Sequence, residues 1–167
     1  MNLETSFTID RDNATIVIRR AFAAPVATVW NFWTVEELLE KWWAPKPWVA
    51  RTRKMDFRQS GEWLYAMVGP EGEEHWAKSE YKAVSEGSSF SSLDSFTDKE
   101  GIVNDSMPQS NWTVDLKEEQ EGHTLVSILI RHEKPEDMDA QLKMGFREGM
   151  TQAMDQLDEL LVNAEKG

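Results

Sequence analysis

The sequence contains no cysteine, and its basic residues are outnumbered by acidic ones. Without cysteine the chain can form no disulfide bond, and it offers neither a thiolate metal ligand nor a thiol nucleophile. Lysine and arginine number 18 against 30 aspartate and glutamate residues, which gives a formal net charge of -12 at pH 7. Because this charge repels phosphate groups, we expect neither nucleic acid nor a membrane surface as a partner.

Long apolar runs are also missing from the sequence. A helix that spans a bilayer needs roughly 20 consecutive apolar residues, and no stretch approaches that length. The first ten residues include Glu4 and Asp10 and lack the apolar centre of a secretion signal, so we expect a cytoplasmic protein. No glycine- or proline-rich tract divides the chain, and residues 1–167 are predicted to form a single domain with a substantial core.

Tryptophan, in contrast, is abundant. The chain has eight tryptophans, and three of them fall in the segment EKWWAPKPW, residues 40–48. Its two prolines limit φ and remove backbone donors, so the segment is predicted to be a stiff connection. Two interpretations of Trp42, Trp43 and Trp48 stay open: they fill a corner of the core, or some of them form the aromatic rim of a ligand cavity.

The apolar pattern predicts one strand, two short helices and then a run of strands. Residues 14–22 are rich in β-branched side chains and indicate the first strand. Pro25 is expected at the first position of a helix, and a capping box of Thr34 and Glu37 is expected to begin the second helix. Over residues 48–131 apolar and polar residues alternate between glycine-containing turns, which predicts about six antiparallel strands.

The last segment predicts one long amphipathic helix that begins at Pro135. Gly145 and Gly149 are expected to lie inside this helix and to leave space beside their neighbours. The order of elements indicates an α+β fold, in which a curved antiparallel sheet of about six or seven strands wraps around the terminal helix. The apolar stripe of that helix consists of Met138, Leu142, Phe146, Met150, Ala153, Leu157, Leu160 and Leu161.

Three motifs occur in a fixed order along the chain. They are RRAFAAPVATVWNFWTVEELLEKWWAPKPW, MDFRQSGEWLYAMVGPEGEE and GFREGMTQAMDQLDELL. Together they resemble the family of proteins similar to the activator of heat-shock protein 90 ATPase, within the START-like (SRPBCC, birch-pollen-allergen-like) superfamily. The resemblance covers about residues 16–161. The chain departs from the family pattern at Ala44 and Ser60, where the family usually has glycine, at Pro47-Trp48, where Gly-Phe is common, and at Met150, where tryptophan is common.

The resemblance implies a helix-grip fold with a cavity between the sheet and the C-terminal helix. Members of the superfamily bind lipids, sterols, hormones or polyketides in that space, so we expect a small apolar or amphipathic ligand and no cofactor. Simple core packing is the alternative for each residue expected in the lining. These residues are Trp42, Trp43, Trp48, Trp63, Tyr65, Phe96, Trp112, Phe146 and Met150.

Signatures of catalysis are weak. The three histidines show no spacing typical of metal ligands, so no metal site is expected. Asp94 and His132, if both face the interior, are candidates for a general acid/base pair, and Tyr65 is a further candidate. An enzyme of cyclase or hydrolase type is therefore one alternative function.

A co-chaperone that binds a chaperone ATPase is the other alternative, and the family resemblance implies it. The eukaryotic activators owe much of their effect to a separate N-terminal domain, which we do not expect here. We also expect a monomer, because nothing in the sequence requires a dimer.

Overall fold

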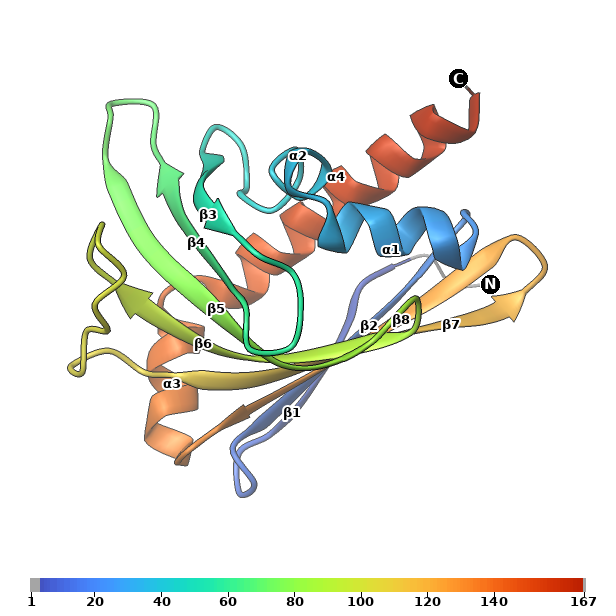
Figure 1. Ribbon diagram of the computed structural model, residues 1–167. Helices are drawn as coiled ribbons and strands as arrows, with labels where there is room; N and C mark the ends of the chain where they lie inside the picture. Colours follow the sequence, from blue (N-terminus) through green and yellow to red (C-terminus); the bar gives the residue numbers. More distant parts are fainter. Residues whose placement is uncertain (1–3, 167) are drawn as a thin grey trace.

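The structure, a computed structural model, describes residues 4–166, and within them it contains eight strands and four helices (Figure 1). Strands β1 (Ser6–Asp10) and β2 (Thr15–Phe22) come first, followed by helices α1 (Val26–Thr34) and α2 (Glu36–Leu39). The next six strands are β3 (Val49–Met55), β4 (Glu62–Val68), β5 (Glu74–Ser85), β6 (Ser89–Thr97), β7 (Ser110–Gln120) and β8 (His123–His132). The last two elements are helices α3 (Pro135–Lys143) and α4 (Phe146–Lys166).

All the strands belong to one antiparallel sheet with the order β1-β2-β8-β7-β6-β5-β4-β3. Figure 1 shows that the sheet is strongly curved and that α1, α2 and α4 lie in its hollow. The expected α+β architecture, a curved sheet around a long C-terminal helix, is confirmed. The six strands expected between residues 48 and 131 are present as β3 to β8.

Strand β1 was not predicted and raises the strand number above the expected six or seven. It pairs with β2 at one edge of the sheet, with Phe7 opposite Ile18 and Ile9 opposite Ile16. Its five residues are mostly exposed, so its apolar alternation is too short and too weak to stand out in the sequence.

The prediction of one uninterrupted terminal helix is wrong. Gly145 has φ +84 and separates α3 from α4, because a glycine in the left-handed conformation ends a helix at little cost. The apolar stripe continues across this break, since Met138 of α3 and Met154 of α4 are both fully buried. Gly149 does lie in α4, but a β-carbon there would meet Pro45 Cγ at 3.6 Å, so Pro45 already occupies the adjacent space.

The starts of the two short helices also differ from the prediction. Pro25 immediately precedes α1 in an extended conformation, and α2 begins after Val35 with no side-chain cap. The expected capping box fails because Thr34 is still the last residue of α1. Its hydroxyl donates to the carbonyl oxygen of Trp30 at 2.9 Å, which is the usual bond of a threonine inside a helix.

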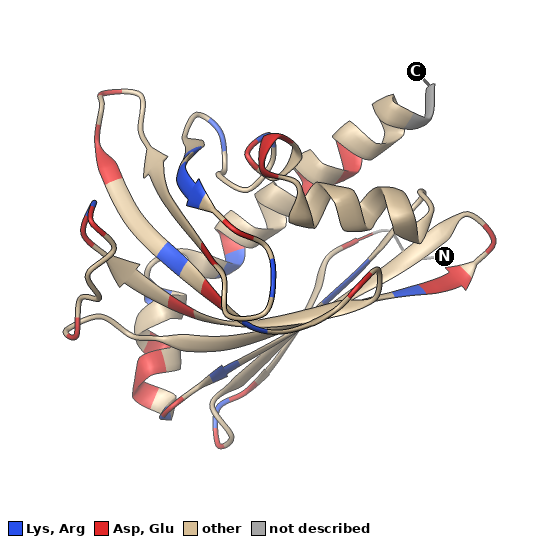
Figure 2. Cartoon of the chain, viewed as in Figure 1, with Lys and Arg blue, Asp and Glu red and all other residues tan. Residues whose placement is uncertain are grey.

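The core fills the space between the concave face of the sheet and α4. Ile18, Ile128 and Ile130 from the sheet are fully buried, as are Met154 and Leu157 from α4. Acidic residues are spread over turns, strand ends and helices instead of forming one patch (Figure 2). Within residues 4–166, no helix has both the length and the apolar composition that crossing a membrane would require.

Candidate ligand site in the hollow of the sheet

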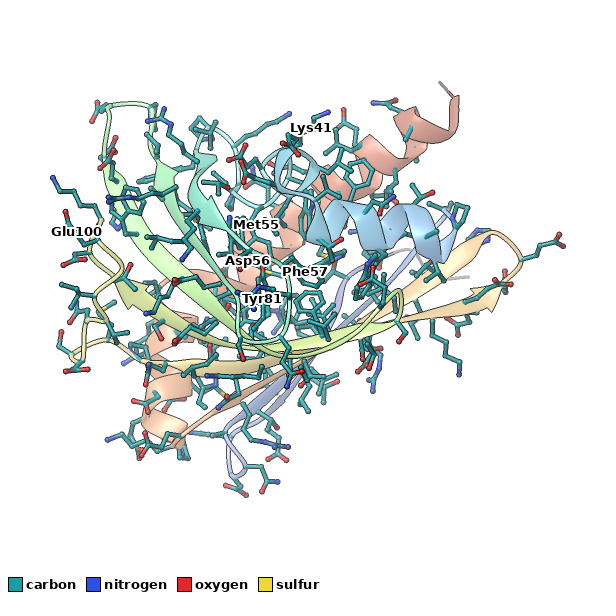
Figure 3. All side chains as sticks on the ribbon, in the orientation of Figure 1. Lys41, Met55, Asp56, Phe57, Tyr81 and Glu100 are labelled. Atoms are coloured by element: carbon teal, nitrogen blue, oxygen red, sulfur yellow. The ribbon has the colours of Figure 1, made fainter. Side chains whose placement is uncertain are left out.

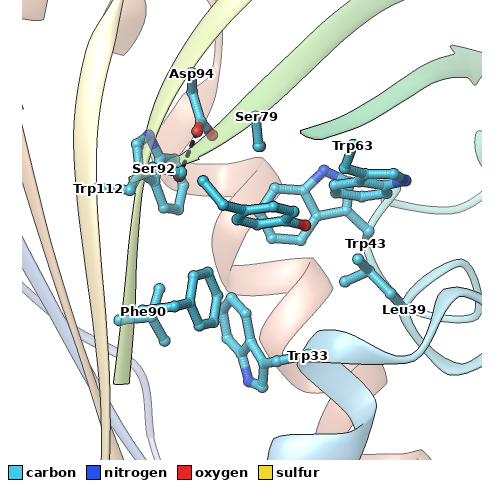
Figure 4. Close-up of a pocket in the computed structure, with 11 residues that line it drawn as sticks. Trp33, Leu39, Trp43, Trp63, Ser79, Phe90, Ser92, Asp94 and Trp112 are labelled. Atoms are coloured by element: carbon cyan, nitrogen blue, oxygen red, sulfur yellow. Dashed lines mark hydrogen bonds between the residues drawn. The ribbon is translucent and has the colours of Figure 1, made fainter. Parts of the chain in front are cut away.

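A small cavity lies in the hollow, between strands β4 to β7 and the segment that carries α1 and α2 (Figure 4). Its volume is about 20 Å³, which is room for one water molecule. Two aliphatic side chains, Leu39 and Val114, belong to its lining. Most of the wall is aromatic and consists of Trp33, Trp43, Trp63, Tyr81, Phe90 and Trp112.

The polar part of the wall is a cluster of three side chains from β5 and β6. Register places Ser79 opposite Asp94, and Ser92 precedes Asp94 by two residues, so all three point to the concave side. The hydroxyl of Ser92 donates to Asp94 Oδ1 at 2.7 Å (Figure 4). Asp94 is the one acidic residue in the cavity lining.

The environment of Asp94 favours its neutral form. Burial among aromatic rings raises the pKa of Asp94 from 3.8 to about 7, although the hydroxyls of Ser92 and Ser79 partly oppose this shift. The raised pKa makes the protonated form accessible near neutral pH, and in that form the carboxyl group can donate as well as accept a hydrogen bond. Such a group among apolar rings is characteristic of functional sites.

Two tyrosines lie near this carboxyl group. Burial, with a smaller contribution from the negative charge of Asp94, raises the pKa of both Tyr65 and Tyr81, so both phenols stay protonated at neutral pH. A further ring covers Tyr81 from outside: the ring centroid of Phe57, in the turn between β3 and β4, lies 4.7 Å from that of Tyr81 (Figure 3). Phe57 is half-buried and also contacts Phe90 at 5.3 Å between centroids.

The tryptophan-rich segment connects α2 to β3 and is bound to α4 through Gln156. Gln156 Oε1 accepts a hydrogen bond of 2.9 Å from the backbone nitrogen of Lys46. Its Nε2 donates to the carbonyl oxygens of Trp42 and Ala44 at 3.0 Å each. These bonds satisfy buried backbone groups that belong to neither helix nor strand, and they hold the segment against α4.

The three tryptophans of this segment have different surroundings. Trp42 is fully buried and its indole nitrogen donates to the carbonyl oxygen of Phe32 at 2.9 Å. Trp43 reaches the cavity wall. Trp48 is half-buried outside the cavity, where its ring centroid lies 5.3 Å from that of His75. Trp42 therefore packs in the core, whereas Trp43 lines the cavity.

Of the nine residues expected to line the cavity, the structure brings three to its wall, namely Trp43, Trp63 and Trp112. Two more lie directly behind that wall. The ring of Tyr65 stacks on Trp63 with centroids 3.8 Å apart, and Phe146 meets Trp112 edge-on at 6.0 Å.

The other expected residues lie elsewhere. Trp42 and Met150 are buried outside the cavity wall, and Trp48 is the half-buried residue beside His75. Phe96 lines a different hollow, at the end of the sheet.

The structure does not assemble Asp94 and His132 into one site. Asp94 pairs with Ser110 across the sheet and Ser110 pairs with His132, so both side chains face the same way but stand two strands apart. His132 Nε2 contacts Gln141 Oε1, and its Nδ1 lies 3.4 Å from the carbonyl oxygen of Ala14. His132 is therefore held by the turn that precedes β2 and by α3, away from the cavity. Within residues 4–166, no three histidine, aspartate or glutamate side chains are grouped closely enough to hold a metal ion.

Sequence reasoning missed Trp33, Tyr81 and Phe90 among the aromatic wall. Phe90 could have been found, since Phe90, Ser92 and Asp94 alternate along one strand and must share a face. Trp33 and Tyr81 carried no such signal, because their position depends on how α1 docks and on the register between β5 and β6.

Residues 23–162 match the family described as Activator of Hsp90 ATPase homolog 1-like protein. The chain belongs to this family. Three solved structures share its fold over nearly the whole chain. Protein Ms6760 from Mycobacterium smegmatis is 34% identical with a TM-score of 0.86, and the alignment covers 94% of this chain and 96% of that one.

The second structure is a protein from Arthrobacter aurescens, 30% identical with a TM-score of 0.88, where 95% of this chain and 91% of that chain are covered. The third is a protein from Nitrosomonas europaea, 26% identical with a TM-score of 0.80 and coverage of 93% and 98%. Among curated proteins, the search finds no match to the chain. Membership of the Activator of Hsp90 ATPase homolog 1-like family establishes the architecture, while function depends on the residues of the site.

Proposed function

We propose that the protein binds a small amphipathic molecule in the hollow of the sheet. The polar group of the ligand bonds to Asp94, and its apolar part lies against the tryptophans of the cavity wall. The observation that carries this proposal is the carboxyl group of Asp94, which is turned into a space walled by aromatic rings. Hydrogen bonds from Ser92 and Ser79 only partly offset the burial of this carboxyl group, and a carboxyl group with a pKa raised in this way favours a role in binding.

The size of the cavity sets a condition on this proposal. Its volume of about 20 Å³ holds a water molecule, whereas pockets for small organic ligands measure roughly 300–1,000 Å³. Binding therefore requires wall side chains to move apart. Phe57 is the best-placed side chain to begin this movement, because it is half-buried in a turn and covers both Tyr81 and Phe90.

General acid/base catalysis at Asp94 is a second candidate function. It is supported by the pKa of Asp94, which at about 7 lies in the range that suits proton transfer at neutral pH. The variant Asp94→Asn distinguishes the two candidates. If Asp94 only binds a ligand, the variant weakens binding; if Asp94 is a general acid/base, the variant abolishes turnover. The chaperone partner implied by the family name stays a prediction, supported by that name alone.

Native mass spectrometry tests the binding proposal. The protein is purified from its own host, measured under non-denaturing conditions, and then incubated with a panel of fatty acids, sterols and aromatic polyketides. We expect a one-to-one adduct that Trp112→Ala removes and Asp94→Asn weakens. Asp115→Asn is the matched control, since Asp115 is exposed on the opposite face of β7. An unliganded mass throughout the panel would overturn the proposal.

A further inference from the structure

A second hollow opens at the end of the sheet and shares no lining residue with the Asp94 cavity. It lies between the start of β5, the end of β6 and the loop formed by residues 98–109. Its volume is about 430 Å³, which falls within the usual range for small-molecule sites. Trp76, Phe96 and Met107 supply the apolar part of its lining. We call this hollow the β5–β6 groove.

Two carboxylates border the β5–β6 groove, those of Glu74 and Asp98. The indole nitrogen of Trp76 donates to Glu74 Oε1 at 3.3 Å, so this carboxylate lies at the edge of the ring and leaves the ring faces to other contacts. Asp98 Oδ1 accepts backbone hydrogen bonds from Glu100 at 2.9 Å and from Ile102 at 3.0 Å, which hold the second carboxylate in place. Figure 2 shows acidic segments on both sides, at the start of β5 and in the loop.

The loop that forms one wall is held by several bonds of its own. The backbone nitrogen of Asn104 donates to the carbonyl oxygen of Phe96 at 2.8 Å, and its side-chain oxygen accepts from the backbone nitrogen of Ser106 at 3.1 Å. The guanidinium of Arg53 on β3 contacts the carbonyl oxygen of Lys99. A wall that is already ordered loses little conformational freedom when a ligand arrives.

We propose that the β5–β6 groove binds a small organic cation, such as a quaternary ammonium compound or an alkyl amine. The cation would lie against the ring of Trp76, whose face attracts positive charge, and near the carboxylate of Glu74, which alternation places on the same face of β5. The carboxylate of Asp98 borders the same groove. Lys99 is the one cationic side chain in the lining, and it is exposed, so its long stem can turn the ammonium towards solvent. The net charge of -12 also repels anionic ligands and attracts cationic ones.

Choline and 3,3-dimethylbutan-1-ol test the proposal, because they have the same shape and differ in charge. Each is titrated into the ¹⁵N-labelled protein while the indole N–H signals of the tryptophans are recorded, with the Trp76 signal assigned from Trp76→Phe. We expect choline to shift the Trp76 signal in a saturable way and to bind about tenfold more tightly than the neutral alcohol. An unmoved Trp76 signal, or equal affinity for the two compounds, would overturn the proposal.

The variant Glu74→Gln distinguishes attraction of the cation by the Glu74 carboxylate from attraction by the net charge of the protein. Glutamine keeps an acceptor for the Trp76 indole but removes the charge, and Glu74 is exposed, so the variant should fold normally. We expect its affinity for choline to fall about fivefold. Glu118→Gln is the matched control, since Glu118 is exposed on β7 outside the groove lining and the change in net charge is identical. An equal fall in both variants would mean that overall charge alone attracts choline, which would also overturn the proposal.

Discussion

The indole nitrogen of Trp43 donates a hydrogen bond of 3.0 Å to the hydroxyl oxygen of Tyr65. Both side chains are buried, and the Tyr65 ring stacks on Trp63, so this bond joins the tryptophan-rich segment to strand β4. The bond satisfies the buried indole N–H of Trp43, whose ring otherwise packs against aromatic rings. Trp43 is thereby fixed in the wall of the Asp94 cavity.

Removal of the Tyr65 hydroxyl should lower the free energy of unfolding. In Tyr65→Phe the buried indole N–H of Trp43 loses its acceptor, which costs about 1–3 kcal/mol. Urea unfolding followed by circular dichroism measures the difference. Tyr81→Phe is the control, because it also deletes a buried phenol hydroxyl but leaves the Trp43 bond intact. Equal losses in the two variants would show that the Trp43 bond contributes nothing specific.

The raised pKa of Asp94 predicts a particular dependence of stability on pH. Between about pH 4 and pH 7 the folded protein binds more protons at Asp94 than the unfolded chain does, so this residue makes stability fall as pH rises through that window. Asparagine at this position does not titrate. We therefore expect Asp94→Asn to gain stability relative to the parent between pH 5 and pH 8, by about 2–3 kcal/mol.

Thermal and urea unfolding of both proteins at pH 5, 6, 7 and 8 measure this gain. Asp115→Asn is again the control, since its carboxylate is exposed on the other face of the sheet. A difference between Asp94→Asn and the parent that stays constant from pH 5 to pH 8 would contradict a raised pKa at Asp94.

Ser60 occupies a position that suits glycine. It has φ +69 in the turn between β3 and β4, where a side chain strains the left-handed conformation. We expect Ser60→Gly to raise the free energy of unfolding by about 0.5–1 kcal/mol, because the relief of strain exceeds the greater freedom of glycine in the unfolded chain.

The neighbouring Gln59 provides the control, since it is exposed in the same turn and has no positive φ. Gln59→Gly should lower the free energy of unfolding by a few tenths of a kcal/mol up to about 1 kcal/mol. If both substitutions lower stability, the left-handed backbone of Ser60 carries no strain that glycine relieves.

The sequence was sufficient to predict the layers of the fold but not the details of the site. Trp112 is predicted correctly because apolar and polar residues alternate strictly in NWTVDLKE, and this alternation shows which side chains point into the core. Gly145 was misjudged because the apolar stripe continues through the break, and periodicity reports which face is buried without reporting where a helix stops. Trp33 and Tyr81 meet at the cavity only through packing between distant elements, which no local pattern encodes.

The bonds of Gln156 explain how a segment with two prolines can be buried, and they predict its most sensitive residue. In Gln156→Leu three backbone groups, the carbonyl oxygens of Trp42 and Ala44 and the nitrogen of Lys46, lose their partner at once. Each buried group left unpaired costs about 1–3 kcal/mol, although relaxation and water restore part of this, so we expect a loss of about 3–4 kcal/mol in urea unfolding.

Gln152 lies one helical turn earlier and donates to the carbonyl oxygen of Lys46 at 3.0 Å, but it is exposed. Gln152→Leu should therefore cost less than about 1 kcal/mol, because water can replace its bond. Gln156→Glu adds a stricter test: glutamate still accepts from Lys46 but cannot donate to the two carbonyl oxygens, so it should destabilise almost as much as leucine. A glutamate variant as stable as the parent would mean that the donor bonds do not hold the tryptophan-rich segment against α4.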